Sequence, residues 1–293
     1  IFIIIKKKIK MSTYNQKKGL KRKVLDKFYT KPTVVNFCIK KVSKYIQIHK
    51  KDLILEPSGG AGAFLEGIKS LGKNYVFYDV MPENKEIIKH DFLTLDVEPL
   101  VKSYQRIHVI GNPPFGRQSS LAIKFIKKSC TFCKSISFIL PKSFKKESLK
   151  KVFPLNFHLL AEFDLNRNAF LLNGGDYNVP TVFQIWIQKD YNRQSPRLEK
   201  PVNFRFVKKG DNPQISFRRV GVYAGQISTQ KINEKSDQSH YFIKFLNMDS
   251  NNELIQELKK IMFSESLNTV GPRSISKQEL IVKFNKIIEK RQK

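Results

Sequence analysis

The sequence predicts an α/β fold, in which helices cover both faces of a mostly parallel sheet. From Leu25 to residue 190, short apolar runs of strand length alternate with segments of helical periodicity. A Gly-rich turn follows the first of these runs, as it does at the carboxyl edge of many parallel sheets. The chain has 293 residues, 41% of them hydrophobic, which is enough apolar material for a core of this kind.

Apolar runs of strand length recur through the first two thirds of the chain and are predicted to be strands. They lie at residues 52–55, 75–78, 107–110, 135–140, 158–163 and 182–187. Helices are predicted at residues 63–71 and 119–128, and a basic helix at 142–152. This alternation is typical of a parallel sheet, because parallel strands need a crossover connection between them.

The chain from Lys189 onwards is less regular. Strand-like pieces lie at residues 203–207, 215–220 and 240–246. They precede an amphipathic helix at residues 277–289, for which Ser276 is the expected cap. We therefore expect three parts: a basic, flexible arm (1–24), the α/β domain (25–190) and a small, basic α+β extension (191–293).

Charge is distributed unevenly along the chain. The 54 Lys and Arg outnumber the 25 Asp and Glu, so the formal net charge is +29. Residues 1–51 carry net +15, residues 52–190 net +4 and residues 191–293 net +10. A nearly balanced middle between basic flanks suits an enzyme that binds a polyanion, because cations that pair with phosphates release condensed counterions. An AT-rich genome would also raise the Lys content, but it explains the distribution less well.

The start of the chain and its cysteines exclude other classes. Residues 1–10 place five apolar residues before a basic run, the reverse of a signal peptide, and Met11 is the more natural initiator. We expect residues 1–10 to be leader or added sequence. No apolar run reaches the roughly 18 residues of a membrane span. Three cysteines exclude a disulfide scaffold and fit an intracellular, reducing compartment, whether cytoplasm, nucleus or virus factory.

The first candidate site is the Gly-rich segment after the strand predicted at residues 52–55. Gly59, Gly60 and Gly62 permit a tight turn into a helix, where a ligand can lie against the backbone. The loop has neither the spacing of a dinucleotide fingerprint nor the Lys-Ser/Thr pair of a phosphate loop. Glu56 would repel a pyrophosphate but suits the amino group of a zwitterionic amino-acid moiety. A purely structural turn is the alternative.

Two acidic positions further along are the next candidates. Asp79 ends the predicted strand and lies 19 residues after Gly60, close to the roughly 20-residue offset of a ribose-binding carboxylate. Asp91 and Phe92 follow His90, and a carboxylate beside an aromatic ring would bracket the edge and the face of an adenine. For both positions a solvated loop is the alternative.

The segment from Asn112 to Phe115 carries the most specific signal. It follows the strand predicted at residues 107–110 and reads NPPF. Two consecutive prolines fix φ and give up both N–H groups, so the carbonyls there point at something other than a neighbouring strand. The Asn112 amide oxygen and these carbonyls are acceptors for an exocyclic amine, and Phe115 is a ring for a base to stack on. A rigid strand-to-helix turn with a buried Phe is the alternative.

In this order, these segments resemble the S-adenosylmethionine-dependent N(6)-adenine DNA methyltransferases with an NPPF motif, including phage and viral members. The resemblance rests on Phe28-Tyr29-Thr30-Lys31-Pro32, EPSGGAGAF, Asp79, Asp91-Phe92 and NPPF, and it covers roughly residues 25–190. It implies a Rossmann-like class I methyltransferase with a mostly parallel seven-stranded sheet. It also implies S-adenosylmethionine as the cofactor, no metal, and a basic extension that contacts the nucleic-acid target.

The resemblance implies a role for individual residues. The catalytic residues would be Asn112, Pro113, Pro114 and Phe115. The cofactor-binding residues would be Phe28, Tyr29, Thr30, Pro32, Glu56, Pro57, Ser58, Gly60, Gly62, Phe64, Asp79, Asp91 and Phe92. Among these, the Gly-rich turn would hold the methionine part, Asp79 the ribose hydroxyls and Asp91 the adenine amine. The motif ends in Phe rather than Tyr, which still stacks, and Asn at its head favours adenine over cytosine.

Several alternatives stay open at this point. DNA is the first expectation for the substrate and RNA the second, because the basic flanks serve either polyanion. The positive charge disfavours a protein-glutamine methyltransferase, and the intact motifs disfavour a non-catalytic nucleic-acid-binding subunit with a relict cofactor fold. The sequence indicates no membrane partner, and it sets neither a recognition sequence nor an oligomeric state.

We expect the other conspicuous residues to have structural roles. Cys130 and Cys133 have no second pair nearby and are expected to be ordinary buried or half-buried thiols. The five histidines are scattered and are expected to be structural. The Gly-rich residues 168–180 are expected to form either a flap beside the base pocket or a simple long hairpin.

Overall fold

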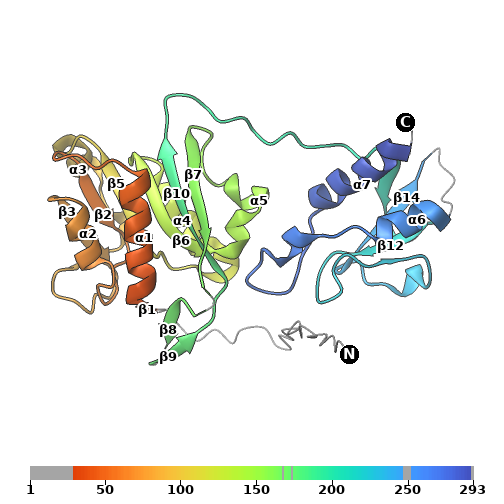
Figure 1. Ribbon diagram of the computed structural model, residues 1–293, viewed down its shortest axis with the longest axis horizontal. Helices are drawn as coiled ribbons and strands as arrows, with labels where there is room; N and C mark the ends of the chain where they lie inside the picture. Colours follow the sequence, from red (N-terminus) through yellow and green to blue (C-terminus); the bar gives the residue numbers. More distant parts are fainter. Residues whose placement is uncertain (1–28, 167, 173, 247–251, 292–293) are drawn as a thin grey trace, which may run out of the picture.

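The chain forms a large and a small lobe, joined by an extended connection after Gln188 (Figure 1). The structure is a computed structural model that describes residues 29–166, 168–172, 174–246 and 252–291. The arm expected over residues 1–24 and the candidate residue Phe28 lie outside this described part. Within it, no helix has the length and apolar character needed to cross a membrane.

The large lobe is built on one seven-stranded sheet. Its strands, from edge to edge, are β4 (Ile88–Lys89), β3 (Tyr75–Asp79), β2 (Leu53–Glu56), β5 (Ile107–Gly111), β6 (Ser135–Pro141), β10 (Thr181–Gln188) and β7 (Phe157–Asp164). The first five run parallel, and β10 runs antiparallel to both of its neighbours. The predicted mostly parallel α/β sheet is therefore confirmed. The reversed direction of β10 was not predicted.

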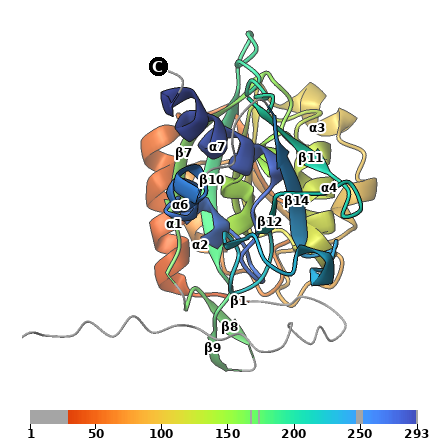
Figure 2. The same ribbon diagram turned by 90° about the vertical axis from the view of Figure 1, so that its right-hand side faces the viewer.

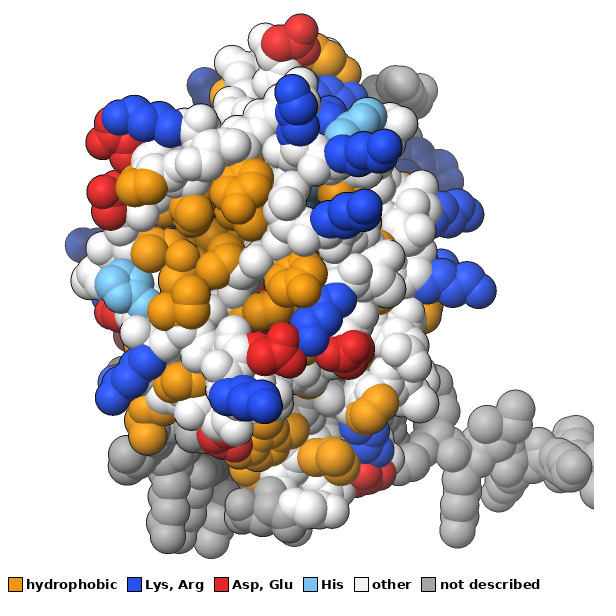
Figure 3. All heavy atoms as spheres, turned by 90° about the vertical axis from the view of Figure 1, so that its left-hand side faces the viewer, with side chains coloured by type: hydrophobic (Ala, Val, Ile, Leu, Met, Phe, Trp, Pro, Cys, Tyr) orange, Lys and Arg blue, Asp and Glu red, His pale blue; other side chains and the backbone are white. Residues whose placement is uncertain are grey.

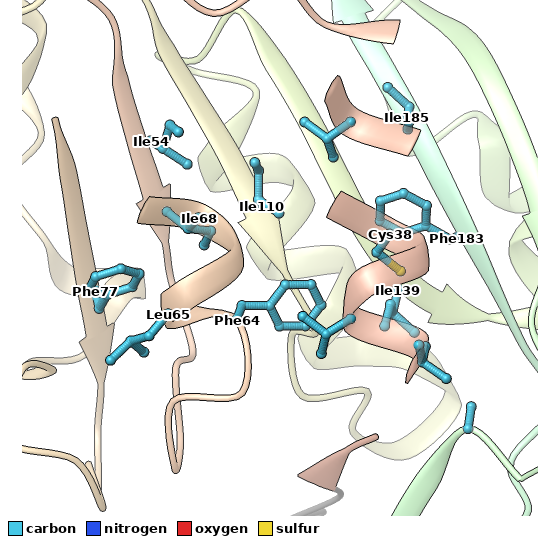
Figure 4. Packing of buried hydrophobic residues seen from close by; sticks show 14 of the residues in the cluster. Cys38, Ile54, Phe64, Leu65, Ile68, Phe77, Ile110, Ile139, Phe183 and Ile185 are labelled. Carbon is cyan, nitrogen blue, oxygen red and sulfur yellow. The ribbon is translucent and has the colours of Figure 1, made fainter. Parts of the chain in front are cut away.

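Helices cover both faces of this sheet. They are α1 (Pro32–Tyr45), α2 (Leu65–Leu71), α3 (Glu98–Ser103) and α4 (Ser120–Ser129), with short turns η1 (Phe92–Thr94) and η2 (Arg117–Ser119) beside them. Side chains alternate along each strand, so Ile54 faces the core under α1 and α2, whereas its neighbours Leu53 and Leu55 face the other core. Figure 4 shows Ile54 and Ile110 on the first of these faces, with Ile68 of α2 nearby. Burial on both faces explains why these strands read as continuous apolar runs.

The basic helix predicted at residues 142–152 is wrong. The segment forms the turn η3 (Lys142–Lys145) and the short helix α5 (Glu147–Lys150), separated by Lys146 at φ −78° and ψ 138°. Tertiary contacts explain the break. The Phe144 side chain is fully buried, and its carbonyl accepts a hydrogen bond of 3.0 Å from Gln184 Nε2. Lys146 Nζ donates to the Ser274 carbonyl at 2.7 Å and lies 3.3 Å from Glu279, which links the two lobes.

A small second sheet lies at the lower end of the large lobe (Figure 1). It consists of β1 (Tyr29–Thr30), β8 (Phe170–Leu172) and β9 (Gly175–Tyr177), all antiparallel. The hairpin expected as one possibility for residues 168–180 is therefore present as β8 and β9. It is tied to the start of the described chain by the β1–β8 pairing and by an ion pair between Lys31 and Asp176.

Exposed apolar side chains lie near the β4 edge of the main sheet. Figure 3 views the molecule from this side and shows hydrophobic side chains gathered on it. The exposed ones on and beside β3, β4 and α3 are Tyr75, Val80, Met81, Ile88 and Val101. In the described chain, β4 has only two residues and pairs with β3 alone, and so short an edge strand offers little to edge-to-edge pairing.

The small lobe has its own sheet and its own core. Its strands, in spatial order, are β11 (Phe204–Val207), β14 (His240–Phe245), β12 (Ile215–Arg218) and β13 (Ile227–Ser228), all antiparallel. Helices α6 (Asn252–Lys259) and α7 (Lys277–Arg291) pack on it, with turns η4 (Ile232–Glu234) and η5 (Ser264–Leu267). The predicted cap is confirmed, because Ser276 Oγ accepts from the Glu279 amide at 3.2 Å and Glu279 Oε2 accepts from the Ser276 amide.

Candidate active site

A cavity of about 350 Å³ opens at the carboxyl ends of β2, β3 and β5. Its lining includes residues from every predicted segment: Tyr29, Thr30, Glu56, Pro57, Ser58, Gly60, Phe64, Asp79, Asp91, Phe92, Asn112, Pro113, Pro114 and Phe115. Among the predicted residues that the structure describes, two do not line it. Pro32 begins α1, and Gly62 turns the chain at φ +91°. The glycine turn (residues 59–62) and the proline bend (residues 112–115) thus share one cavity.

The Asp79 carboxylate connects the glycine turn to the loop after β3. One carboxylate oxygen accepts from the Gly60 amide at 2.8 Å and the other from the Met81 amide at 2.7 Å. Gly60 has φ +54°, and a β-carbon added there would meet no heavy atom within 4 Å. The loops after β2 and β3 are therefore clamped together, with open space against the backbone. Each Asp79 oxygen keeps a second lone pair for a ligand hydroxyl.

One carboxyl oxygen of Glu56 has no hydrogen-bond partner in the described chain. Its side chain is 1% exposed, and Oε2 accepts no hydrogen bond from the described part of the chain. Burial, with a smaller contribution from the Asp79 carboxylate, raises the pKa of Glu56 to about 8. A buried carboxyl group without a partner costs free energy, which a bound cation or donor removes. This orphaned oxygen is the first sign that the cavity is built for a ligand.

Asp91 and Phe92 give another part of the cavity wall one polar and one aromatic side chain. Asp91 Oδ1 accepts from the Leu93 amide at 2.9 Å and starts η1, while the carboxylate itself is exposed. The Phe92 ring is 1% exposed and packs 5.2 Å from that of Phe125, which also lines the cavity. No sequence signal marked Phe125 as a site residue, because its spacing on α4 is that of an ordinary core position.

The mouth of the cavity carries one further carboxylate that was not predicted. Tyr29 Oη donates to Glu83 Oε2 at 2.9 Å, and both residues line the cavity. Glu83 follows β3, and its backbone amide donates to the Gly60 carbonyl at 2.9 Å. No local sequence signal marks Glu83, since the contact joins positions 54 residues apart.

Asn112 presents one unpartnered oxygen. Its Nδ2 donates to Thr30 Oγ1 at 3.2 Å, and its main-chain carbonyl accepts from Ser58 Oγ, also at 3.2 Å. Its Oδ1 is buried and has no hydrogen-bond partner within the described residues. Thr30 and Ser58 thus hold the residue from two sides, and the side-chain acceptor stays available to a ligand in the cavity.

Phe115 belongs both to the core and to the cavity. Its ring is 7% exposed, packs in the apolar cluster under α1, and lines the cavity beside Leu121. Its carbonyl accepts from the amides of Leu121 and Ala122 at 3.2 and 3.3 Å, which starts α4. The bend is therefore fixed at both ends: Thr30 holds Asn112 at its start, and α4 holds Phe115 at its end.

The remaining titratable groups lie elsewhere or are inert. His108 is buried at the opposite edge of the sheet, within 2.7 Å of Ser135 Oγ and 3.2 Å of Asp52, so its role is structural as expected. Burial raises the pKa of Cys130 to about 12 and that of Cys133 well above its ordinary value, so both thiols stay protonated. In the described residues no cluster of His, Cys, Asp and Glu is suited to a metal ion.

The strand order described above, with one antiparallel strand next to the last, is that of the class I S-adenosylmethionine-dependent methyltransferases, and the large lobe has this fold. No family model matches the sequence. No curated protein matches it either.

Solved structures show a distant likeness. The 23S rRNA methyltransferase ErmE aligns with a TM-score of 0.42 and 13% identity, over 57% of this chain and 71% of that one. A methyltransferase subunit of a type I restriction-modification system from Streptococcus thermophilus aligns at 0.41 and 15%, over 56% and 45%. A dimethyladenosine transferase from Plasmodium falciparum aligns at 0.39 and 17%, over 56% and 64%. Likenesses this distant assign no activity to this chain.

Proposed function

We propose that this chain transfers a methyl group from S-adenosylmethionine to the 6-amino group of adenine in DNA. The observation that carries the proposal is the buried Oδ1 of Asn112, which has no partner in the described chain and lies in the same cavity as the unpartnered Oε2 of Glu56. One orphaned acceptor suits the ammonium group of the methyl donor, and the other suits the amine that receives the methyl group. Both acceptors need a ligand to satisfy them.

The cavity fits the methyl donor. Its volume of about 350 Å³ falls within the range of small-molecule pockets, roughly 300–1,000 Å³. Glu56 would pair with the donor's ammonium group, Asp79 would accept from the ribose hydroxyls, and Asp91 would accept from the adenine amine. Phe92 would lie against the adenine ring, and Gly60 leaves room for the chain of the ligand. When bound, S-adenosylmethionine supplies a methyl group that its sulfonium has already activated.

The bend orients a weak nucleophile. The lone pair of an adenine amine is delocalised into the ring, so attack requires the nitrogen to become more tetrahedral. Asn112 Oδ1 would accept one amine hydrogen and the Pro113 carbonyl the other, which favours that geometry. Phe115 would support the base, which must leave the duplex stack to reach the cavity. The proton then leaves to solvent, so no basic side chain is needed.

Charge supports a nucleic-acid substrate. The net charge of +29 is concentrated in the flanks of the chain, where it would pair with phosphates without disturbing the nearly balanced middle. The order of the motifs favours DNA. The same acceptors would also bind adenine in RNA. The experiment must therefore distinguish DNA from RNA as the substrate.

The proposal is tested by transfer of a tritiated methyl group to duplex DNA, single-stranded DNA and total RNA in parallel. We expect label in DNA. Label in RNA alone would replace the substrate class but keep the chemistry. The absence of label from all three, with cofactor binding intact, would refute the proposed activity.

Thr30 should act as a positioning residue through its bond to Asn112. Thr30→Val keeps the shape but removes the acceptor, so the amide nitrogen of Asn112 loses its partner. Loss of a buried hydrogen bond costs about 1–3 kcal/mol, so we expect kcat to fall roughly 5- to 100-fold. Thr30→Ser retains the hydroxyl and should retain most of the rate. Equal rates for the Val and Ser variants would contradict this role.

Gly60 should matter for cofactor affinity. Gly60→Ala places a side chain at φ +54° and costs about 1–2 kcal/mol of stability. Gly174→Ala is a matched control, because Gly174 has φ +77° and equally open surroundings but does not line the cavity. We expect similar losses of melting temperature for both variants, and weaker cofactor binding, measured by calorimetry, for Gly60→Ala only. Unchanged affinity in Gly60→Ala would contradict the placement of the ligand against the turn.

A further inference from the structure

The small lobe contains a separate basic cleft. Its volume is about 530 Å³, and it lies between β11, the start of β14 and the start of α7. The charged side chains that line it are Lys208, Lys209, Arg219, Lys277 and Asp237. Four cations thus face one carboxylate, and neither the cofactor cavity nor the catalytic bend includes any of these residues.

The cations of this cleft have no acidic partners among the described residues, unlike the lysines of η3, of α5 and of the residue between them. Lys142 and Lys145 pair with Asp164, Lys146 pairs with Glu279, and Lys150 lies near Glu147 and Glu162. By contrast, none of the four cleft cations forms an ion pair with any carboxylate in the parts of the chain that the structure describes. Their charge therefore remains available to an external anion.

Aromatic rings hold two of these cations in place. Lys277 Nζ lies 4.8 Å from the ring centroid of Phe206 and 5.9 Å from that of Tyr241. The Arg219 guanidinium lies 5.5 Å from the Tyr241 centroid, and its Nε donates to the Gln238 carbonyl at 3.1 Å. These contacts reduce the entropy lost when an anion binds. Because the cations already cover these rings, the cleft suits a phosphate backbone better than a stacked base.

The cleft also lies next to the junction of the two lobes. Ser274 and Glu279, on either side of Lys277 in the sequence, both contact Lys146 of the large lobe. Lys146 follows β6 at the carboxyl edge of the main sheet, the edge on which the cofactor cavity opens. Figure 2 shows the small lobe in front of that sheet when viewed from its own side. A polymer bound in the cleft would therefore pass close to the large lobe.

We propose that this cleft binds the phosphodiester backbone of the nucleic acid that carries the target adenine. The inference rests on the proposed function for its choice of polymer. Lys208, Lys209, Arg219 and Lys277 supply the phosphate contacts, so the cleft contributes affinity and register, whereas the Asn112 bend performs the chemistry.

The test is nucleic-acid binding by the full chain, followed by fluorescence anisotropy over a series of salt concentrations. The variant Lys208→Gln/Lys277→Gln removes two cleft charges and keeps the side-chain stems. Lys73→Gln/Lys127→Gln is the matched control, because both lysines are exposed and lie outside the basic flanks, just before β3 and in the last turn of α4. Labelled duplex and single-stranded DNA are the ligands, and inorganic phosphate is the competitor.

We expect the cleft variant to bind DNA roughly ten-fold or more weakly at about 0.1 M salt, with the slope of log K against log salt reduced by about 0.9 for each lost contact. The control should change much less, and phosphate should compete only weakly with the polymer. An equal loss of DNA affinity in the two variants, or no loss of affinity in the cleft variant, would overturn the proposal. Phosphate competing as well as DNA would show a simple anion site and would also overturn it.

Methyl transfer separates this proposal from the function on which it rests. If the wild type transfers methyl groups and the cleft variant has an unchanged KM for DNA, the cleft proposal fails alone. If DNA binding depends on the cleft but no methyl transfer occurs, the proposed activity fails and the cleft stands. We expect the cleft variant to raise KM for DNA and to leave cofactor affinity unchanged.

Discussion

Asn112→Ala is expected to reduce methyl transfer roughly 100- to 1,000-fold, the cost of removing one preorganised hydrogen-bonding group at a reacting centre. The variant loses the only side-chain oxygen on the bend, which is buried and unpartnered in the described structure. The amine would then lack one of the two acceptors that free its lone pair. Single-turnover transfer of a tritiated methyl group measures the effect without a contribution from product release.

Two controls separate this chemistry from folding. Cofactor affinity should change little in Asn112→Ala, because Glu56 and the glycine turn are untouched. Asn178→Ala removes another buried amide oxygen that lacks a partner in the described chain but does not line the cavity, and it should keep its activity. An Asn112→Ala variant with full activity would refute the assignment of this oxygen.

Glu56→Gln is expected to stabilise the protein above pH 8 while it weakens cofactor binding. In the fold the pKa of this carboxyl is raised from 4.5 to about 8. The folded chain therefore holds this proton over a pH range in which the unfolded chain has released it, so this group's contribution to stability is full below pH 4.5 and is lost as the pH rises towards 8. A Gln side chain does not ionise. At alkaline pH the variant should exceed the wild type by a few kcal/mol in its free energy of unfolding, since one pKa unit corresponds to about 1.4 kcal/mol.

The same carboxyl should make cofactor binding depend on pH. A bound ammonium group favours the ionised form of Glu56, so binding releases a proton wherever the free carboxyl is protonated. We expect affinity to rise between about pH 6 and pH 8, the pKa of the free site, and to level off above it. Calorimetry in buffers of different ionisation enthalpy counts the released proton. The Glu56→Gln variant should bind more weakly and show no such slope; a slope unchanged in that variant would assign the proton elsewhere.

Local pattern alone predicted most of the large lobe. The strands β2, β3, β5 and β6 were each found within a residue or so of their bounds, because burial on both faces makes them continuous apolar runs between turn residues. Asn112 and Glu56 were singled out because prolines and glycines mark the two bends beside them, and the structure places both in one cavity. These signals depend on residues that are adjacent in the sequence, so they can be recognised without the structure.

The features that were missed depend on contacts between distant residues. The basic segment at residues 142–152 has helical composition, yet the burial of Phe144 and the link from Lys146 to the small lobe break it. The reversed direction of β10 follows from its place between β6 and β7, which no local pattern encodes. The Thr30–Asn112 bond joins positions 82 residues apart. Tertiary contacts of this kind override local preference.

We expect the bend and the glycine turn together to deliver a methyl group to an adenine amine. The most direct measurement is the identity of the methylated nucleoside, obtained by digesting labelled DNA and separating its nucleosides. A matched duplex that carries purine, which lacks the 6-amino group, in place of adenine should take up no label. We expect all label in N(6)-methyldeoxyadenosine. Label in a methylated cytosine, or in the duplex without adenine, would show that the methyl group goes to an atom other than the adenine amine.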